Sequence, residues 1–70
     1  MTLKEVFRKN VIYYRKERNI SQEKLAELSD LSTNYIGDIE RNNRKVTIDT
    51  IEKIAKGLNV KAELLLNENE

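Results

Sequence analysis

The sequence predicts a single all-α domain of five short helices. Its 70 residues include no proline and two glycines, so little interrupts helix formation. Apolar residues recur at helical spacing along most of the chain, and no segment alternates apolar and polar residues as a strand does. A chain of this length forms one domain, and we expect residues 1–70 to act as one unit.

The first helix is expected to begin at Thr2, because its hydroxyl can cap the backbone while Glu5 reciprocates three residues later. The apolar stripe of this helix comprises Leu3, Phe7, Val11 and Tyr14. Asn19 is a suitable stop in the left-handed conformation.

Two short helices follow, separated by about three residues. Ser21 caps the first, which ends near Asp30, and Ser32 caps the second, which extends through Arg41. The expected inward residues are Leu25, Ala26, Leu28, Ile36 and Ile39. Ala26 is small where the two helices cross. Residues 21–41 thus predict a helix-turn-helix whose second helix projects outward, as entry into a major groove requires.

A polar, basic loop over residues 42–46 leads to a fourth helix capped by Thr47. The apolar stripe of this helix comprises Ile48, Ile51, Ile54, Ala55 and Leu58. Asn59 ends it, and a short fifth helix is expected over residues 61–66.

Composition narrows the function classes. The chain has no Cys and no His, which excludes disulfides, zinc fingers and the commonest nucleophile and base pairs. We therefore expect no enzyme and no metal or other cofactor. The longest aliphatic run is three leucines, and charges interrupt the first residues, so we expect no membrane span or signal peptide and a cytoplasmic protein. The net charge is +3 over residues 1–45 and −2 over residues 46–70, which fits one DNA-facing side and scattered surface charge equally well.

The chain resembles the Cro/cI-type (XRE-like) helix-turn-helix family of repressors, whose fold is the lambda-repressor-like five-helix domain. The resemblance covers about residues 7–65 and rests on Arg15, Ser21, Gln22, Leu25, Ala26, Leu31, Ser32, Ile36, Ile39–Arg41 and Ile51–Val60. The run from Tyr35 to Arg44 is similar to the controller proteins of restriction–modification systems, although phage repressors and antitoxin-type regulators share much of it. Asp30 departs from the family, which usually has Gly at this turn.

The resemblance implies a transcriptional regulator that binds double-stranded DNA as a homodimer on a near-palindromic operator and blocks or recruits RNA polymerase. The implied base-reading residues are Ser32, Thr33, Asn34 and Asp38. Asn34 suits paired hydrogen bonds to adenine, and Asp38 could accept from cytosine. The alternative is an ordinary solvated helix face. Gly37 fits either a close approach to DNA or a tolerated imperfection in the helix.

Further roles concern phosphates, an ion pair and a subunit contact. The expected phosphate contacts are Gln22, Tyr35, Asn43, Arg44 and Lys45, of which each basic residue alone could be a solubility charge.

The resemblance implies a partly buried ion pair between Arg15 and Glu40, against the alternative that Arg15 reaches a phosphate. For the dimer contact, Leu64 and Leu66 of the fifth helix are expected, with Val6, Ile12 and Tyr13 as competing candidates.

An antitoxin-like or other protein-interaction module with secondary DNA binding is the main alternative function. A free-standing antitoxin usually carries an extra toxin-binding segment, for which 70 residues leave little room. An enzyme is disfavoured further because Asp38 and Glu40, two residues apart on a helix, do not face each other.

Overall fold

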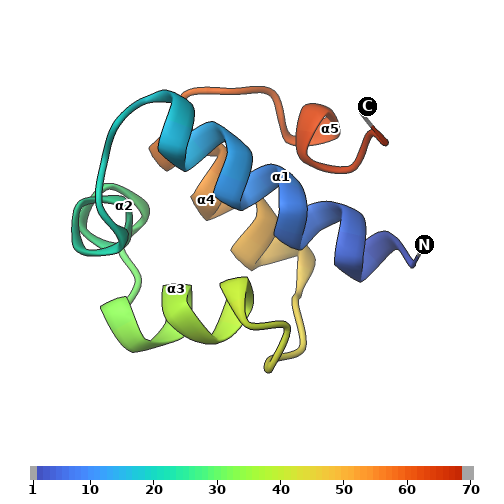
Figure 1. Cartoon of the computed structure of the whole chain (residues 1–70), viewed down its shortest axis with the longest axis horizontal. Helices are drawn as coiled ribbons and strands as arrows, with labels where there is room; N and C mark the ends of the chain where they lie inside the picture. Colours follow the sequence, from blue (N-terminus) through green and yellow to red (C-terminus); the bar gives the residue numbers. More distant parts are fainter. Residues whose placement is uncertain (1, 69–70) are drawn as a thin grey trace.

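The structure is a computed structural model that describes residues 2–68, and it confirms the all-α, five-helix fold. The helices are α1 (Leu3–Glu17), α2 (Gln22–Ser29), α3 (Thr33–Glu40), α4 (Ile48–Leu58) and α5 (Ala62–Leu65). In Figure 1, α1 crosses the molecule in front of α4, α2 is seen end-on, and α3 runs along the lower edge.

Hydroxyl side chains begin four of the helices, as predicted. Thr2 Oγ1 accepts a hydrogen bond from the Glu5 amide at 3.2 Å, and the Thr2 amide donates to Glu5 Oε1 at 3.1 Å. Ser21, Ser32 and Thr47 each accept from the amide three residues later, at 3.0 to 3.1 Å. Each cap satisfies an amide that has no partner within the helix, so the cap fixes where the helix starts.

Four helices end at a left-handed residue that is not glycine. These residues are Asn19, Asp30, Asn42 and Asn59, with φ between 57° and 62°. In each case the following amide bonds back to a carbonyl five residues earlier, as Leu31 does to the Ala26 oxygen at 2.9 Å. This is the Schellman ending, and Asn and Asp are the non-glycine residues that tolerate it best. Asp30 therefore preserves the turn despite its departure from the usual Gly.

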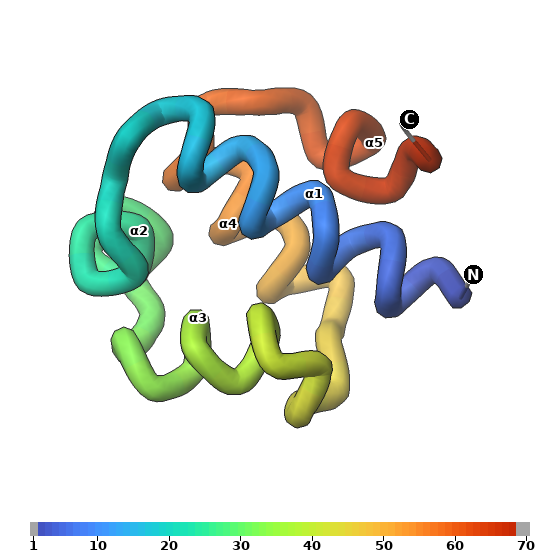
Figure 2. The backbone as a smooth tube through the Cα atoms, in the orientation of Figure 1, coloured from blue at the N-terminus to red at the C-terminus, as the bar shows by residue number. Residues whose placement is uncertain are grey.

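All five helices contribute to one core. Its buried residues are Phe7, Val11, Leu25, Ala26, Ile36, Ile39, Ile54, Ala55, Leu58 and Leu65. Helices α2 and α4 approach so closely at Gly57 that a Cβ there would overlap Ser29 Oγ. Figure 2 shows α5 returning to the side of α1. There the buried Asn10 Nδ2 donates to the Leu65 and Asn67 carbonyls, both at 2.9 Å.

Four apolar residues lie differently from the sequence-based expectation. Leu3, Leu28 and Ile48 were expected to face inward and are exposed, Ile48 by 77%. Leu25, Ala26 and Ser29 form the buried face of α2, which turns Leu28 outward. Leu3 and Ile48 are the first residues of their helices, and each projects beyond the core. Val6 was a candidate for a subunit contact but is buried, so that candidate is wrong.

Candidate nucleic-acid interface

The turn between α2 and α3 sets the direction of α3. Asp30 bends the chain in the left-handed conformation, and Ser32 restarts the helix by accepting from the Tyr35 amide at 3.0 Å. Ala26 is buried in α2, which joins this turn. On α3, Ile36, Gly37 and Ile39 are buried, so the opposite face of the helix must point outward.

The outward face of α3 carries the four residues expected to read bases. Ser32, Thr33 and Asn34 are exposed at the N-terminal end of the helix. Asp38 lies one turn further along and is partly buried. The structure thus brings three of the four residues together as an open polar surface, whereas Asp38 is engaged with neighbouring side chains.

Arg15 and Glu40 join the first helix to the end of α3. Arg15 Nε donates to Glu40 Oε2 at 2.6 Å and Arg15 Nη2 donates to Oε1 at 3.1 Å. Their side chains are 13% and 8% exposed. Arg15 Nη1 also donates to the Ile20 carbonyl, and Arg8 Nη1 to the Glu40 carbonyl. Since the Arg15 donors are used inside the protein, this geometry favours a structural role over a phosphate contact.

Gln22, expected to contact a phosphate, has a partner inside the protein. Its Nε2 donates to Glu40 Oε1 at 2.9 Å, and the residue is partly buried. A shielded carboxylate gathers hydrogen-bond donors because an unpaired buried charge is costly. Gln22 thus completes the Arg15–Glu40 network and uses one of its two side-chain N–H donors there.

Asp38 is bridged by two arginines. Arg41 Nη2 lies 2.7 Å from Asp38 Oδ1, and Arg44 Nη2 lies 3.0 Å from Oδ2. The hydrogen bonds from Arg44 and Arg41 hold the pKa of the Asp38 carboxyl below its ordinary value. Sequence reasoning gave Arg41 no role at the surface. Its position three residues after Asp38 could have indicated this contact, because side chains three apart on a helix can form an ion pair.

Tyr35 connects this group to α4. Its ring lies 4.7 Å from Arg44 Cζ, as in a cation–π contact. Its hydroxyl lies 2.9 Å from Thr50 Oγ1, and Thr50 is buried. Tyr35 and Arg44 are therefore held in place next to the outward face of α3.

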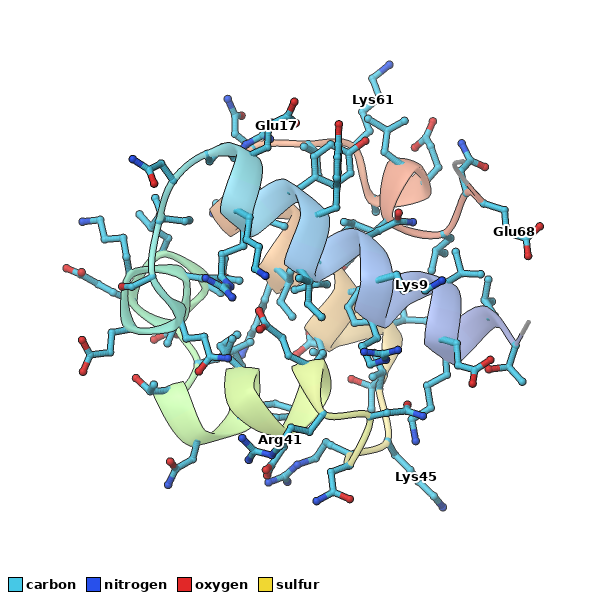
Figure 3. All side chains as sticks on the ribbon, viewed as in Figure 1. Lys9, Glu17, Arg41, Lys45, Lys61 and Glu68 are labelled. Carbon is cyan, nitrogen blue, oxygen red and sulfur yellow. The ribbon has the colours of Figure 1, made fainter. Side chains whose placement is uncertain are left out.

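Basic groups gather beside α3. Figure 3 shows Arg41 and Lys45 at the same lower edge of the molecule, whereas Glu17 and Lys61 lie at the opposite edge. Asn43, Arg44 and Lys45 are all exposed in the loop that follows α3. Together with α3, these residues form a polar surface with an excess of positive charge.

The residues expected at the dimer contact differ in exposure. Leu64 is exposed on α5, whereas Leu66 is partly buried and packs against the core. On α1, Tyr13 is exposed and Ile12 is partly buried. Leu64 and Tyr13 thus offer the more accessible apolar surface of the two helices.

Neither a membrane-spanning helix nor a cluster of metal ligands is found in the described part of the chain. Over residues 2–68, no helix is both long and apolar enough to cross a bilayer. Within the same residues, no three acidic side chains come together as metal ligands.

Comparison with known proteins gives a consistent set of relatives. The helix-turn-helix family matches residues 11–65. Control protein C.SmaI of Serratia marcescens is 47% identical over 66 residues, which cover 94% of this chain and 79% of that protein. Control protein C.BamHI of Bacillus amyloliquefaciens is 55% identical over 49 residues, covering 70% of this chain and 60% of that protein.

Comparison with solved structures identifies the same kind of protein. The crystal structure of the wild-type restriction–modification controller protein C.Esp1396I superposes with a TM-score of 0.86 and 37% sequence identity. The match covers 93% of this chain and 84% of that one.

Proposed function

The chain belongs to the helix-turn-helix family of DNA-binding transcriptional regulators, among the control proteins of restriction–modification systems, and we propose that it acts as a homodimer on a near-palindromic operator. Proteins of this family act by binding and not by catalysis. The observation that carries the proposal is the outward face of α3, where Thr33 and Asn34 are exposed while Ile36 and Ile39 anchor the helix in the core. A helix held in this way can enter a major groove without rearrangement.

Base reading is assigned to the N-terminal half of α3. The Asn34 amide suits the donor and acceptor pattern of adenine N6 and N7. Thr33 can contact a thymine methyl or a phosphate, and Ser32 can reach a neighbouring base or phosphate.

Phosphate binding is assigned to the residues that flank this helix. Arg44 and Lys45 supply positive charge, and Tyr35 and Asn43 supply hydrogen-bond donors beside them. We add Arg41, whose guanidinium lies on the same edge of the molecule as Lys45 (Figure 3).

The dimensions of the protein support a dimer. Its longest extent is 28 Å, whereas successive major grooves on one face of DNA are roughly 34 Å apart. One copy cannot place a reading helix in both grooves, so an operator with two half-sites needs a second copy. We propose that Leu64 of α5 and Leu66, which caps the end of that helix, contribute to the contact between the two copies.

In this proposal the concentration of the protein controls how much of the operator is occupied. Because dimerisation and DNA binding are coupled, operator occupancy rises steeply with protein concentration. RNA polymerase is the proposed further partner, blocked or recruited according to where the operator lies. The protein acts where its DNA lies, in the bacterial cytoplasm.

The test is selection of DNA from a random duplex library by the wild-type protein, followed by affinity measurement on the selected duplex. We expect two inverted half-sites, with binding weakened by Asn34→Ala and by Lys45→Ala. Lys61→Ala is the matched control, since Lys61 is also an exposed lysine but lies at the opposite edge (Figure 3). Enrichment of no motif, or equal losses with Lys45→Ala and Lys61→Ala, would contradict the proposal.

A further inference from the structure

The carboxylate of Asp38 is shared between two guanidinium groups. One oxygen accepts from Arg41 at 2.7 Å and the other accepts from Arg44 at 3.0 Å. Asp38 and Arg41 lie at the end of α3 and on its cap, whereas Arg44 belongs to the loop that follows. The shared carboxylate therefore ties the loop to the reading helix.

Each arginine has a second support. Arg44 lies over the Tyr35 ring, and the Tyr35 hydroxyl is hydrogen bonded to the buried Thr50. Arg41 folds back over Gly37, where an added Cβ would lie 3.1 Å from Arg41 Nη1. The absence of a side chain at Gly37 thus leaves room for the Arg41 guanidinium. An isolated surface ion pair contributes little, but these contacts form a connected group.

The two guanidinium groups remain open to solvent. The side chains of Arg41 and Arg44 are 64% and 48% exposed, while that of Asp38 is 24% exposed. A guanidinium carries five N–H donors in a rigid plane, and each of these two uses one of its nitrogens on Asp38. The remaining donors are available to phosphate oxygens, the usual partners of arginine at a DNA surface.

On the basis of the proposed DNA-binding function, we propose that Asp38 is a positioning residue that holds Arg41 and Arg44 as a paired phosphate clamp beside the reading helix. Long side chains lose rotamer freedom when they are fixed on a ligand. Because Asp38 already restrains both arginines in the free protein, less freedom is lost when they bind a phosphate. The carboxylate also carries a negative charge toward DNA, which opposes binding to every sequence alike. The positioned arginines offset this repulsion only where the phosphates match the clamp. Asp38 thus raises the ratio of specific to non-specific affinity through the two arginines, without itself contacting a base.

The first test compares two charge-matched variants on the selected duplex and on a scrambled duplex of equal length. Asp38→Asn and Glu17→Gln each remove one negative charge from an ion pair with arginine, but Glu17 lies at the edge opposite Arg41 (Figure 3). We expect Asp38→Asn to lower the ratio of specific to non-specific affinity about tenfold, with scrambled DNA bound equally or more tightly. Glu17→Gln should leave the ratio within about twofold. Equal effects of the two variants would overturn the proposal.

The second test asks whether Asp38 acts through the arginines. In a background that carries Arg41→Gln and Arg44→Gln, adding Asp38→Asn should change the ratio by less than about twofold, because the positioned groups are gone. If the full effect of Asp38→Asn persists there, or is confined to one C·G pair of the operator, Asp38 reads a base directly and the proposal is wrong.

A third test needs no DNA, so it separates this proposal from the proposed function. In the free protein, ¹⁵N relaxation of the arginine Nε groups should show Arg44 more ordered in the wild type than in Asp38→Asn. Equal order in the two proteins would overturn the positioning role. If the wild type selects no duplex while Arg44 remains ordered by Asp38, the DNA-binding function fails and not the side-chain geometry.

Discussion

Arg15 and Glu40 form a two-point ion pair across the interior, with Nε–Oε2 and Nη2–Oε1 separations of 2.6 Å and 3.1 Å. The same carboxylate accepts from Gln22 at 2.9 Å. Three helices, α1, α2 and α3, therefore meet at Glu40. The orientation of α3 relative to the remaining domain depends on this residue as well as on the apolar core.

Glu40→Ala should destabilise the protein by about 3 kcal/mol, because it leaves the shielded Arg15 charge without its partner. Urea unfolding of the variant and the wild type measures the difference. Glu27→Ala is the control, since it breaks the exposed pair between Lys24 and Glu27 and should cost within about 0.5 kcal/mol. A loss below about 0.5 kcal/mol for Glu40→Ala would contradict a buried pair.

The two glycines should respond in opposite ways to substitution by alanine. Gly57→Ala should destabilise by about 1–3 kcal/mol, because its Cβ overlaps Ser29 Oγ and meets the backbone of α2. Gly37→Ala should keep or raise stability, since the added Cβ would meet only the far end of the long Arg41 side chain, which can shift by a few tenths of an ångström, and alanine favours the helix by roughly 1 kcal/mol. Denaturant unfolding of both variants tests this, and a larger loss for Gly37→Ala than for Gly57→Ala would be inconsistent with the packing of α2 on α4.

Asp38 should titrate below its ordinary range. Hydrogen bonds from Arg44 and Arg41 lower the pKa of the folded state. A lowered folded pKa means that Asp38 contributes stability above its unfolded pKa of about 3.9, and that this contribution disappears as the pH falls through the lowered value. Carboxyl ¹³C NMR should give a midpoint below about 3.9 in the wild type and a higher one in Arg44→Gln. Identical midpoints would show that Arg44 does not hold the carboxylate in solution.

Base contacts and phosphate contacts should be distinguishable by how strongly DNA affinity depends on salt concentration. Asn34→Ala should cost about 1–3 kcal/mol and relax preference at one base pair, leaving the salt slope unchanged. Lys45→Ala should weaken binding to all sequences and lower the slope of log K against log salt by about one. Binding titrations at several salt concentrations measure both, with Lys61→Ala as the control. If Asn34→Ala changes the salt slope and leaves the base preference unchanged, Asn34 contacts a phosphate and does not read a base.

Helix starts and stops could be predicted from the sequence because they depend on short-range chemistry. A hydroxyl at Ser21 or Ser32 caps an amide three residues later, and Asn59 needs no distant partner to adopt the left-handed conformation. Asn42 ends α3 in the same way, but it lies in a run of polar residues and was expected to be part of a loop.

The inward faces of the short helices were harder to predict. On an eight-residue helix the choice between Leu28 and Ser29 depends on how α2 crosses α4, and the lack of a side chain at Gly57 allows the two helices to approach closely there. Similarly, Ile48 continues the apolar spacing of α4 but lies beyond the end of the core.

The partners of long polar side chains could not be read from spacing alone. Gln22 can reach either a phosphate or Glu40 from the start of α2, and the choice depends on the distance between α2 and the end of α3. The resemblance implied a base-reading role for Asp38, and spacing gave no sign that the loop carrying Arg44 would fold back onto its carboxylate. Such contacts between sequentially separate segments emerge with the tertiary structure.

Methylation interference on the selected duplex tests the central claim, that two α3 helices occupy successive major grooves. Dimethyl sulfate modifies guanine N7 in the major groove and adenine N3 in the minor groove. The account predicts interference at guanine N7 in two clusters separated by about one helical turn, roughly 34 Å, and none at adenine N3 between them. A single cluster, or interference confined to adenine N3, would contradict a dimer that reads DNA through α3.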